Sequence, residues 1–241
     1  MESKWLQNYN KRWSAGIREM MNINEYGYYN MVDIIKPCEK GRFQIKHYTA
    51  TPEQVLEHKA HWDKIGIDSI THGLDKLVVL YDNDITRRYG NNLYSVVMSS
   101  DTIEHQSCKV FNDSAYGDVM IAGLGIGMVI IPLLHNPKVT RITVYEKYQN
   151  IIDMVKPQLD AYIEKNNLTN NLHIICRDIN NPDYSLPQHN VVWIDIWNEM
   201  SSPKRQRDMK LLIRKYRKQL KKNGVIKWWG EDEYYNDRVD V

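Results

Sequence analysis

The most apolar segment of the chain runs from Val119 to Leu134, and its pattern predicts a strand, a tight turn and a helix. Val119–Ala122 is a continuous apolar run of the kind found in buried strands. A turn is indicated next by three glycines at alternate positions, Gly123, Gly125 and Gly127. Glycine lets the backbone bend sharply there and lets a ligand approach closely. Residues 128–135 then begin a helix that Pro132 keeps short or kinked.

This apolar run is too short to cross a membrane. A membrane-spanning helix needs about 20 apolar residues. Here Asp118 and His135 close the run, and glycines and Pro132 interrupt it. Gly123 and Gly127 form a small-xxx-small pair of the kind seen where membrane helices cross, but such pairs also arise wherever glycines cluster. We expect no membrane association.

Apolar runs alternate with helical patterns through the rest of the C-terminal part. Strands are predicted in the segments 139–145, 172–178, 189–195 and 224–232. Helices are predicted over 148–167, interrupted by Pro157, and over 203–222. Strands that alternate with helices form a parallel sheet with right-handed crossovers. The predicted fold class is therefore α/β, with a Rossmann-like sheet.

The first part of the chain has a different pattern. Residues 1–95 are predicted to form an α+β extension, and residues 96–241 the Rossmann-like domain. The extension contains strand patterns at 42–50, 76–82 and 92–98. A capping box predicts that a helix begins at Thr51. We expect the extension to pack over the ligand-binding edge of the sheet as a lid or substrate shelf.

Composition narrows the class of protein only slightly. The chain has 241 residues, a net charge of +2 and three widely spaced cysteines, Cys38, Cys108 and Cys176. This number and spacing fit neither a disulfide framework nor a Cys-x-x-Cys metal site. The N-terminal residues lack the basic-then-apolar layout of a signal peptide. Both observations favour a reducing cytoplasm.

Charge is concentrated in one predicted helix. Residues 203–222 carry ten Lys or Arg and one Asp, with apolar residues spaced for a single helical face. Such a helix has either a solvated basic face or a face that attracts nucleic acid.

An acidic residue follows the glycine turn at an informative distance. Glu146 ends the second predicted strand, 23 residues beyond Gly123. A carboxylate at this offset can accept both ribose hydroxyls of a nucleoside. The turn reads G-x-G-x-G, whereas the dinucleotide fingerprint is G-x-G-x-x-G. The spacing therefore favours a cofactor without phosphates, such as S-adenosylmethionine, over a dinucleotide; a glycine turn with no ligand is the alternative.

Other acids also fall at or just beyond predicted strand ends, and parallel sheets bind ligands at that edge. Asp178 is a candidate for the adenine amino group, or else the first residue of a turn. Asp195 ends a buried apolar run, where a carboxylate is costly unless it is paired or functional, and it is expected to face the reaction centre. Glu231 is more simply explained by a solvated tail.

Other polar residues of the chain also have both a structural and a functional interpretation. Asp101 and Glu104 form either a capping box at a helix start or a pair in which Glu104 reaches the pocket and binds a cationic substrate or the cofactor ammonium. His58 and His61 lie one helical turn apart, but no third ligand accompanies them, so no metal site is predicted. Asn181–Tyr184 is interpreted as a turn.

The chain resembles class I S-adenosylmethionine-dependent methyltransferases, in particular their spermidine synthase-like branch. The resemblance lies in two segments, "VMIAGLGIGMVIIPLLHNPKVTRITVYEKYQNII" and "HNVVWIDIW". The stretch from Val96 to the glycine turn and the ending "KWWGEDE" are similar to uncharacterised phage and bacterial members of that superfamily. The resemblance implies the fold and the cofactor, and it favours a binding role for Glu104. Two departures stand out: Asn198 takes the place of a second acid that helps to hold a polyamine, and the sheet lacks the usual C-terminal hairpin.

The leading hypothesis is therefore a methyltransferase with a small-molecule acceptor, a cation being one candidate. Gly123, Gly125 and Gly127 would admit the amino-acid portion of the cofactor, Glu146 the ribose and Asp178 the adenine. Asp195 would orient the acceptor or take its proton. The alternatives are aminopropyl transfer from decarboxylated S-adenosylmethionine and a non-catalytic nucleic-acid-binding module.

Overall fold

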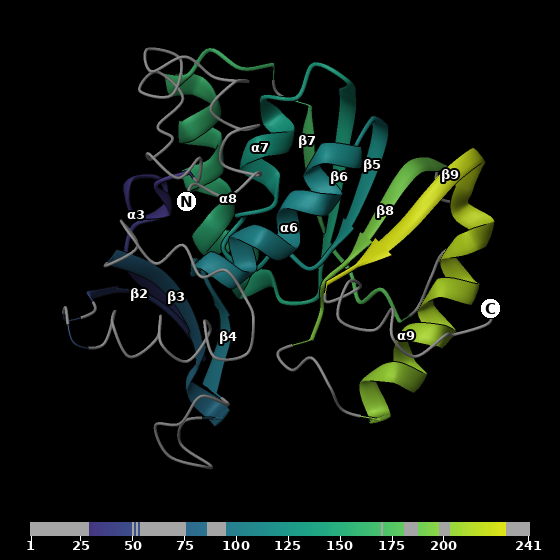
Figure 1. Ribbon diagram of the computed structural model, residues 1–241. Helices are drawn as coiled ribbons and strands as arrows, with labels where there is room; N and C mark the ends of the chain where they lie inside the picture. The colour runs from purple at the N-terminus through teal and green to yellow at the C-terminus, as the bar shows by residue number, and fades with distance from the viewer. Residues whose placement is uncertain are drawn as a thin grey trace.

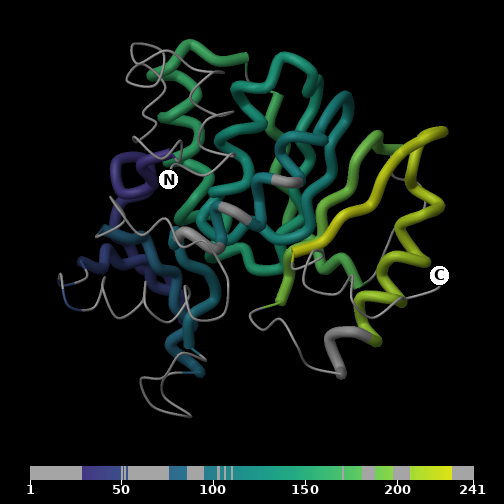
Figure 2. The backbone as a smooth tube through the Cα atoms, in the orientation of Figure 1, coloured from purple at the N-terminus to yellow at the C-terminus, as the bar shows by residue number. Residues whose placement is uncertain are grey.

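The structure, a computed structural model, contains an antiparallel and a parallel sheet (Figure 1). It describes residues 29–49, 51, 53, 76–85, 95–169, 171–180, 188–197 and 203–229. Figure 2 follows the chain from the purple and blue strands of the antiparallel sheet, at one side of the molecule, to the yellow strand β9 at the other. The predicted helix at Thr51, the two histidines at positions 58 and 61, and the predicted turn at 181–184 lie outside these residues.

The parallel sheet confirms the predicted Rossmann-like fold. Its strands are β5 (Gly117–Ala122), β6 (Val139–Glu146), β7 (Leu172–Cys176), β8 (His189–Ile194) and β9 (Leu220–Trp228). They are all parallel and lie in the order β7-β6-β5-β8-β9. Counted along the chain this is the 3-2-1-4-5 order of doubly wound sheets. β9 is the edge strand beside β8 among the described residues.

Helices cover both faces of this sheet. On one face lie α6 (Thr102–Ser114), α7 (Ile130–Leu134) and α8 (Gln149–Lys165). On the other lies α9 (Pro203–Tyr216). Alternate residues of the strands point to opposite faces, so Val119 and Ile121 join the first core and Met120 and Ala122 the second. Burial on both faces explains why this strand reads as an uninterrupted apolar run.

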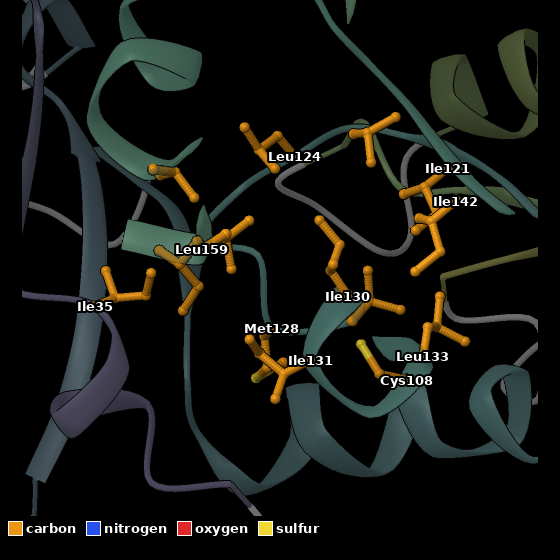
Figure 3. Close-up of a cluster of buried hydrophobic side chains, with 14 of the residues drawn as sticks. Ile35, Cys108, Ile121, Leu124, Met128, Ile130, Ile131, Leu133, Ile142 and Leu159 are labelled. Carbon is orange, nitrogen blue, oxygen red and sulfur yellow. The ribbon is translucent and has the colours of Figure 1, made fainter. Parts of the chain in front are cut away.

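The larger core surrounds the turn after β5 (Figure 3). Ile121 from β5, Ile142 from β6 and Leu159 from α8 all contribute to it. The short helix α7 adds Ile130, Ile131 and Leu133 (Figure 3). Its five residues agree with the short helix expected from Pro132. The turn after β5 is therefore packed against a layer of buried apolar side chains.

The predicted interruption at Pro157 and the predicted end of the basic helix were both wrong. α8 is continuous through Pro157. Proline removes one helical hydrogen bond, but Pro157 is exposed, so water can reach the carbonyl left without a partner. α9 ends at Tyr216 instead of Lys222; a 3₁₀ turn at Arg217–Gln219 follows, and Leu220 already pairs with His189 of β8. Strand pairing has overridden the helical spacing there.

The antiparallel sheet has the order β1-β2-β3-β4. Its strands are β1 (Cys38–Lys40), β2 (Phe43–Thr49), β3 (Lys76–Asp82) and β4 (Val96–Ser99). The helix α3 (Met31–Ile34) packs against β3 and α8, and β1 also contacts α8. Because β4 pairs with β3, the antiparallel sheet extends to Ser99, beyond the boundary predicted at residue 95.

Candidate functional site

The carboxyl ends of β5, β6 and β8 meet at one edge of the parallel sheet. Their arrowheads point toward the side of the molecule on which β4 lies (Figure 1). Ladder hydrogen bonds continue past the strands: the Gly123 N–H donates to the Tyr145 carbonyl at 2.9 Å, and the Asp195 N–H to the Ala122 carbonyl at 2.9 Å. The residues that directly follow β5 and β8 are therefore held by the same ladder of hydrogen bonds as the strands.

The glycine turn requires glycine for its backbone shape. The φ angles are +97° at Gly123, +51° at Gly125 and +76° at Gly127, a region that residues with a Cβ avoid. Protein atoms also occupy the space that a Cβ would take at two of these positions: the Asp195 carbonyl at Gly123 and the Met98 sulfur at Gly125. At Gly127 a Cβ would make a tight contact of 3.1 Å with the Leu159 side chain. The predicted bend is present, and close packing within the protein is a second reason for glycine.

Glu146 joins the turn to the end of β6. Its side chain is buried, Oε2 accepts a hydrogen bond from the Leu124 N–H at 2.9 Å, and Oε1 accepts one from the Tyr148 N–H at 2.8 Å. Burial raises the pKa of this carboxyl, while the backbone donors and the Lys147 charge oppose the shift. A carboxylate has about four acceptor positions, so the Glu146 carboxylate retains capacity for a hydroxyl of a ligand.

A cavity of about 270 Å³ lies over this edge. The parallel sheet contributes residues at or just beyond strand ends: Gly123, Glu146, Arg177 and Asp195. The antiparallel sheet and its turns contribute the opposite wall: Arg42, Phe43, Asp82 and Met98. Ligands bind at this edge in doubly wound sheets. Arg42, Phe43 and Asp82 belong to the predicted N-terminal extension, and its role as a lid or substrate shelf stays a prediction.

Two acids, Glu104 and Asp195, line one part of the cavity. Glu104 lies in the first turn of α6, and Asp195 directly follows β8. Burial raises the pKa of Glu104 well above its usual value; the nearby Asp195 and Asp101 carboxylates add to the rise, and the Trp229 side chain opposes it. Burial and the same carboxylates also raise the pKa of the Cys108 thiol. A cation placed beside Glu104 and Asp195 would relieve their repulsion.

Asp101 is the N-cap of α6. Its Oδ1 accepts a hydrogen bond from the Glu104 N–H at 3.0 Å, and its Oδ2 accepts one from the Ser99 hydroxyl at 2.8 Å. It is not among the residues that line the cavity. The capping alternative thus describes its contacts, and a catalytic role for Asp101 stays a prediction.

Replacing Asp101 with alanine is expected to destabilise the protein by about 1 kcal/mol, because an orphan helix N–H loses its acceptor. Asp101→Asn keeps an acceptor and is expected to lose less. Urea denaturation measures both differences. A fully stable Asp101→Asn variant without activity would instead support the catalytic role.

Asp178 makes the contacts of a turn residue. Its Oδ1 accepts a hydrogen bond from the Asn180 N–H at 2.9 Å, and Oδ2 forms an ion pair with Lys147 at 3.2 Å. Partial burial works against ionisation, yet the Asn180 and Lys147 contacts lower the pKa of Asp178 overall. Its neighbours Arg177 and Ile179 line the cavity, whereas Asp178 does not. The adenine role proposed for it stays a prediction.

Sequence patterns gave no indication of Arg42. It lies in the β1–β2 turn, pairs with Asp82 at 2.9 Å, and lies over the rings of Phe43 and Tyr148 at 4.8 and 4.7 Å. Phe43 belongs to the antiparallel sheet and Tyr148 follows β6, so this cation joins the two halves of the cavity. The strand pattern over residues 42–50 predicts which face of the strand each side chain lies on, but it does not predict which residues from other elements contact it.

The remaining candidates contribute nothing to the site as described. Asn198 and Glu231 lie in parts of the chain that the structure leaves undescribed. Within the described ranges, no group of three or more His, Cys, Asp or Glu side chains could hold a metal ion. No helix among them has the length and apolar character needed to span a membrane.

Comparison with known proteins gives matches among solved structures. No protein-family model and no curated protein matches the chain. The CcbJ methyltransferase from Streptomyces caelestis is 18% identical over 52% of this chain and 47% of that protein, with a TM-score of 0.40. An S-adenosylmethionine-dependent methyltransferase from Clostridium acetobutylicum ATCC 824 is 17% identical over 52% of this chain and 47% of that protein, with a TM-score of 0.37. The N-methyltransferase NodS from Bradyrhizobium japonicum WM9, in complex with S-adenosyl-L-homocysteine, is 12% identical over 54% of this chain and 62% of that protein, with a TM-score of 0.40. The chain thus spans about half the length of the first two, and the fold assignment rests on the strand order and register given above.

Proposed function

We propose that this protein is an S-adenosylmethionine-dependent methyltransferase. The observation that carries the proposal is the buried Glu146 carboxylate, which is bonded to the glycine turn at Leu124 and lines a cavity at the carboxyl edge of the sheet. This combination suits a nucleoside, because the carboxylate can accept ribose hydroxyls while the turn presents bare backbone.

The residues present fit this cofactor. Glu146 would hold the ribose, and Gly123 and Gly125, which line the cavity, would lie against the amino-acid portion. Asp178 is the proposed partner of the adenine. When bound, the cofactor would supply a methyl group already activated by its sulfonium, so the chain mainly has to position the acceptor.

The acceptor that the cavity suits best is an amine. Asp195 and Glu104 are carboxyls, and Ile196 and Trp197 add an apolar wall next to them. A carboxylate can hold an ammonium group and then accept its proton as the nitrogen becomes the nucleophile. We assign the orienting role to Asp195 and the charge-binding role to Glu104.

Two measurements test the proposal. Calorimetry with S-adenosylhomocysteine tests the cofactor site, and saturable binding is expected. Incubation with S-adenosylmethionine and a panel of primary amines and polyamines, followed by mass spectrometry, tests transfer. Absence of cofactor binding by the folded protein would contradict the proposal. A propylamine adduct formed from decarboxylated S-adenosylmethionine would replace methyl transfer by aminopropyl transfer.

Glu104→Gln is expected to retain or gain stability at neutral pH and to lose amine turnover. The raised pKa means that the folded protein binds this proton more tightly than the unfolded chain, whose Glu pKa is about 4.3. Stability therefore falls as the pH rises from that value through the folded-state pKa. Urea denaturation at several pH values should show a flatter profile for the variant.

The exposed Glu164 supplies the control for this experiment. Glu164→Gln should leave both the pH profile and turnover unchanged. A Glu104→Gln variant that unfolds more easily yet turns over normally would show that Glu104 is structural.

A further inference from the structure

The outer side of α9 carries a line of exposed cations. Met209, Leu212, Ile213 and Tyr216 of this helix are buried; Leu212 and Tyr216 belong to the core on that face of the sheet. The opposite side presents a basic stripe, defined as Arg207, Lys210 and Arg214 of α9 and Arg217 of the 3₁₀ turn that continues it, all exposed. Their spacing of three, four and three residues places them along one helical face. Figure 1 shows α9 as the outermost helix on the β9 side of the sheet.

Few acids lie near the basic stripe, and two of the neighbouring lysines have partners elsewhere. Asp208 is the single acid among residues 203–219, and it is half-buried. Lys215 donates to the Asn180 carbonyl at 2.9 Å, and Lys221 pairs with Asp118. No ion pair between described residues involves any member of the basic stripe. Most of this charge is therefore presented to solvent, although the whole chain carries a net charge of only +2.

We propose that the basic stripe binds the phosphate backbone of nucleic acid. At about 1.5 Å per residue, the stripe is about 15 Å long, which corresponds to about four nucleotide steps of about 3.4 Å. Arg and Lys on one face of a helix suit a regular line of phosphates, and such contacts position a protein without reading sequence.

An anionic membrane is a weaker match to the same helix. Helices that lie on membranes bury their apolar face among the lipids. In α9 that face is already packed against the sheet, and Leu211, 54% exposed, is the one large apolar side chain on the described outer side. The inference does not depend on the proposed methyl transfer, because binding requires neither cofactor nor acceptor.

Fluorescence anisotropy of the full chain with labelled single-stranded RNA and duplex DNA of about 20 nucleotides tests the proposal. Four phosphate contacts predict a slope of log K against log salt of about −3.6 for duplex DNA, or about −2.8 for single strands. The affinity should then fall about 150-fold or about 50-fold between about 50 and about 200 mM KCl.

A charge-matched comparison locates the surface. The triple variant Arg207→Glu, Lys210→Glu, Arg214→Glu should bind nucleic acid at least about 30-fold more weakly than wild type at low salt. Its slope of log K against log salt should be close to that expected for a single phosphate contact. The control triple Lys138→Glu, Arg141→Glu, Lys165→Glu changes exposed cations elsewhere by the same net charge and should bind nearly as wild type does. The corresponding glutamine variants are used if the glutamates prevent folding, which circular dichroism would reveal.

Equal losses in the two triple variants would overturn the proposal, since they would indicate a response to net charge alone. Absence of nucleic-acid binding at low salt would also overturn it. So would tighter binding to polyglutamate or to phosphatidylserine vesicles than to nucleic acid. Because each arm omits cofactor, a negative result leaves the calorimetric test of the methyltransferase proposal unaffected.

Discussion

Glu146→Ala is expected to weaken S-adenosylhomocysteine binding by about 100-fold or more. Hydrogen bonds to a charged group contribute about 1.5–3 kcal/mol each, and a loss of about 2.7 kcal/mol corresponds to a factor of about 100. The variant loses the proposed acceptors of both ribose hydroxyls. It also leaves the Leu124 and Tyr148 N–H groups without their acceptor, so the turn itself is expected to become less ordered.

This second effect calls for a separate measurement of folding. Calorimetry gives the affinity, and urea denaturation gives the stability, which should fall by about 1–3 kcal/mol. Glu146→Gln retains one side-chain acceptor oxygen and should fall between wild type and Glu146→Ala in both quantities. Glu164→Ala, an exposed glutamate on α8, is the neutral comparison. Unchanged affinity in a folded Glu146→Ala protein would remove the main support for the cofactor assignment.

Gly123→Ala is expected to be the most destabilising single change in the turn, by about 4 kcal/mol or more. At φ +97° a Cβ is strained, and it would lie 1.9 Å from the Asp195 carbonyl oxygen. That oxygen belongs to the backbone just after β8, so it cannot move without disturbing the sheet. The loss is measured by urea denaturation, or as insoluble expression if the variant does not fold.

Gly125→Ala provides the matched comparison. Its φ of +51° also disfavours alanine, but the atom its Cβ would meet is the Met98 sulfur, 2.2 Å away at the far end of a flexible side chain. Met98 can rotate, and the expected loss is the left-handed backbone cost of about 1–2 kcal/mol. Equal losses at the two positions would show that backbone conformation, and not the contact with Asp195, determines the requirement for glycine.

The sequence indicated the parallel sheet because its strands are buried on both faces. Val119–Ala122 is apolar without interruption for this reason, and the glycines and Glu146 follow at spacings that local geometry dictates. Those residues lie where the pattern placed them. Asp178 shows the limit of the same reasoning, since an acid beyond a strand can equally close a local turn with Asn180, as this one does.

The opposite wall of the cavity could not be predicted in this way. Arg42 and Met98 reach the site because the antiparallel sheet docks on the parallel one, and that contact joins segments far apart in the chain. Hydrophobic periodicity describes one element at a time. The end of α9 was misplaced for the same reason: Leu220 has helical spacing, but its pairing with His189 depends on tertiary structure.

The position of Arg42 over the rings of Phe43, from the antiparallel sheet, and Tyr148, at the start of α8, has a thermodynamic consequence. A molecule enclosed between these two walls would act as a non-covalent cross-link between the N-terminal and C-terminal halves of the chain. Occupancy would raise the melting temperature in proportion to the logarithm of ligand concentration. It would also merge any separate melting of the halves into one transition.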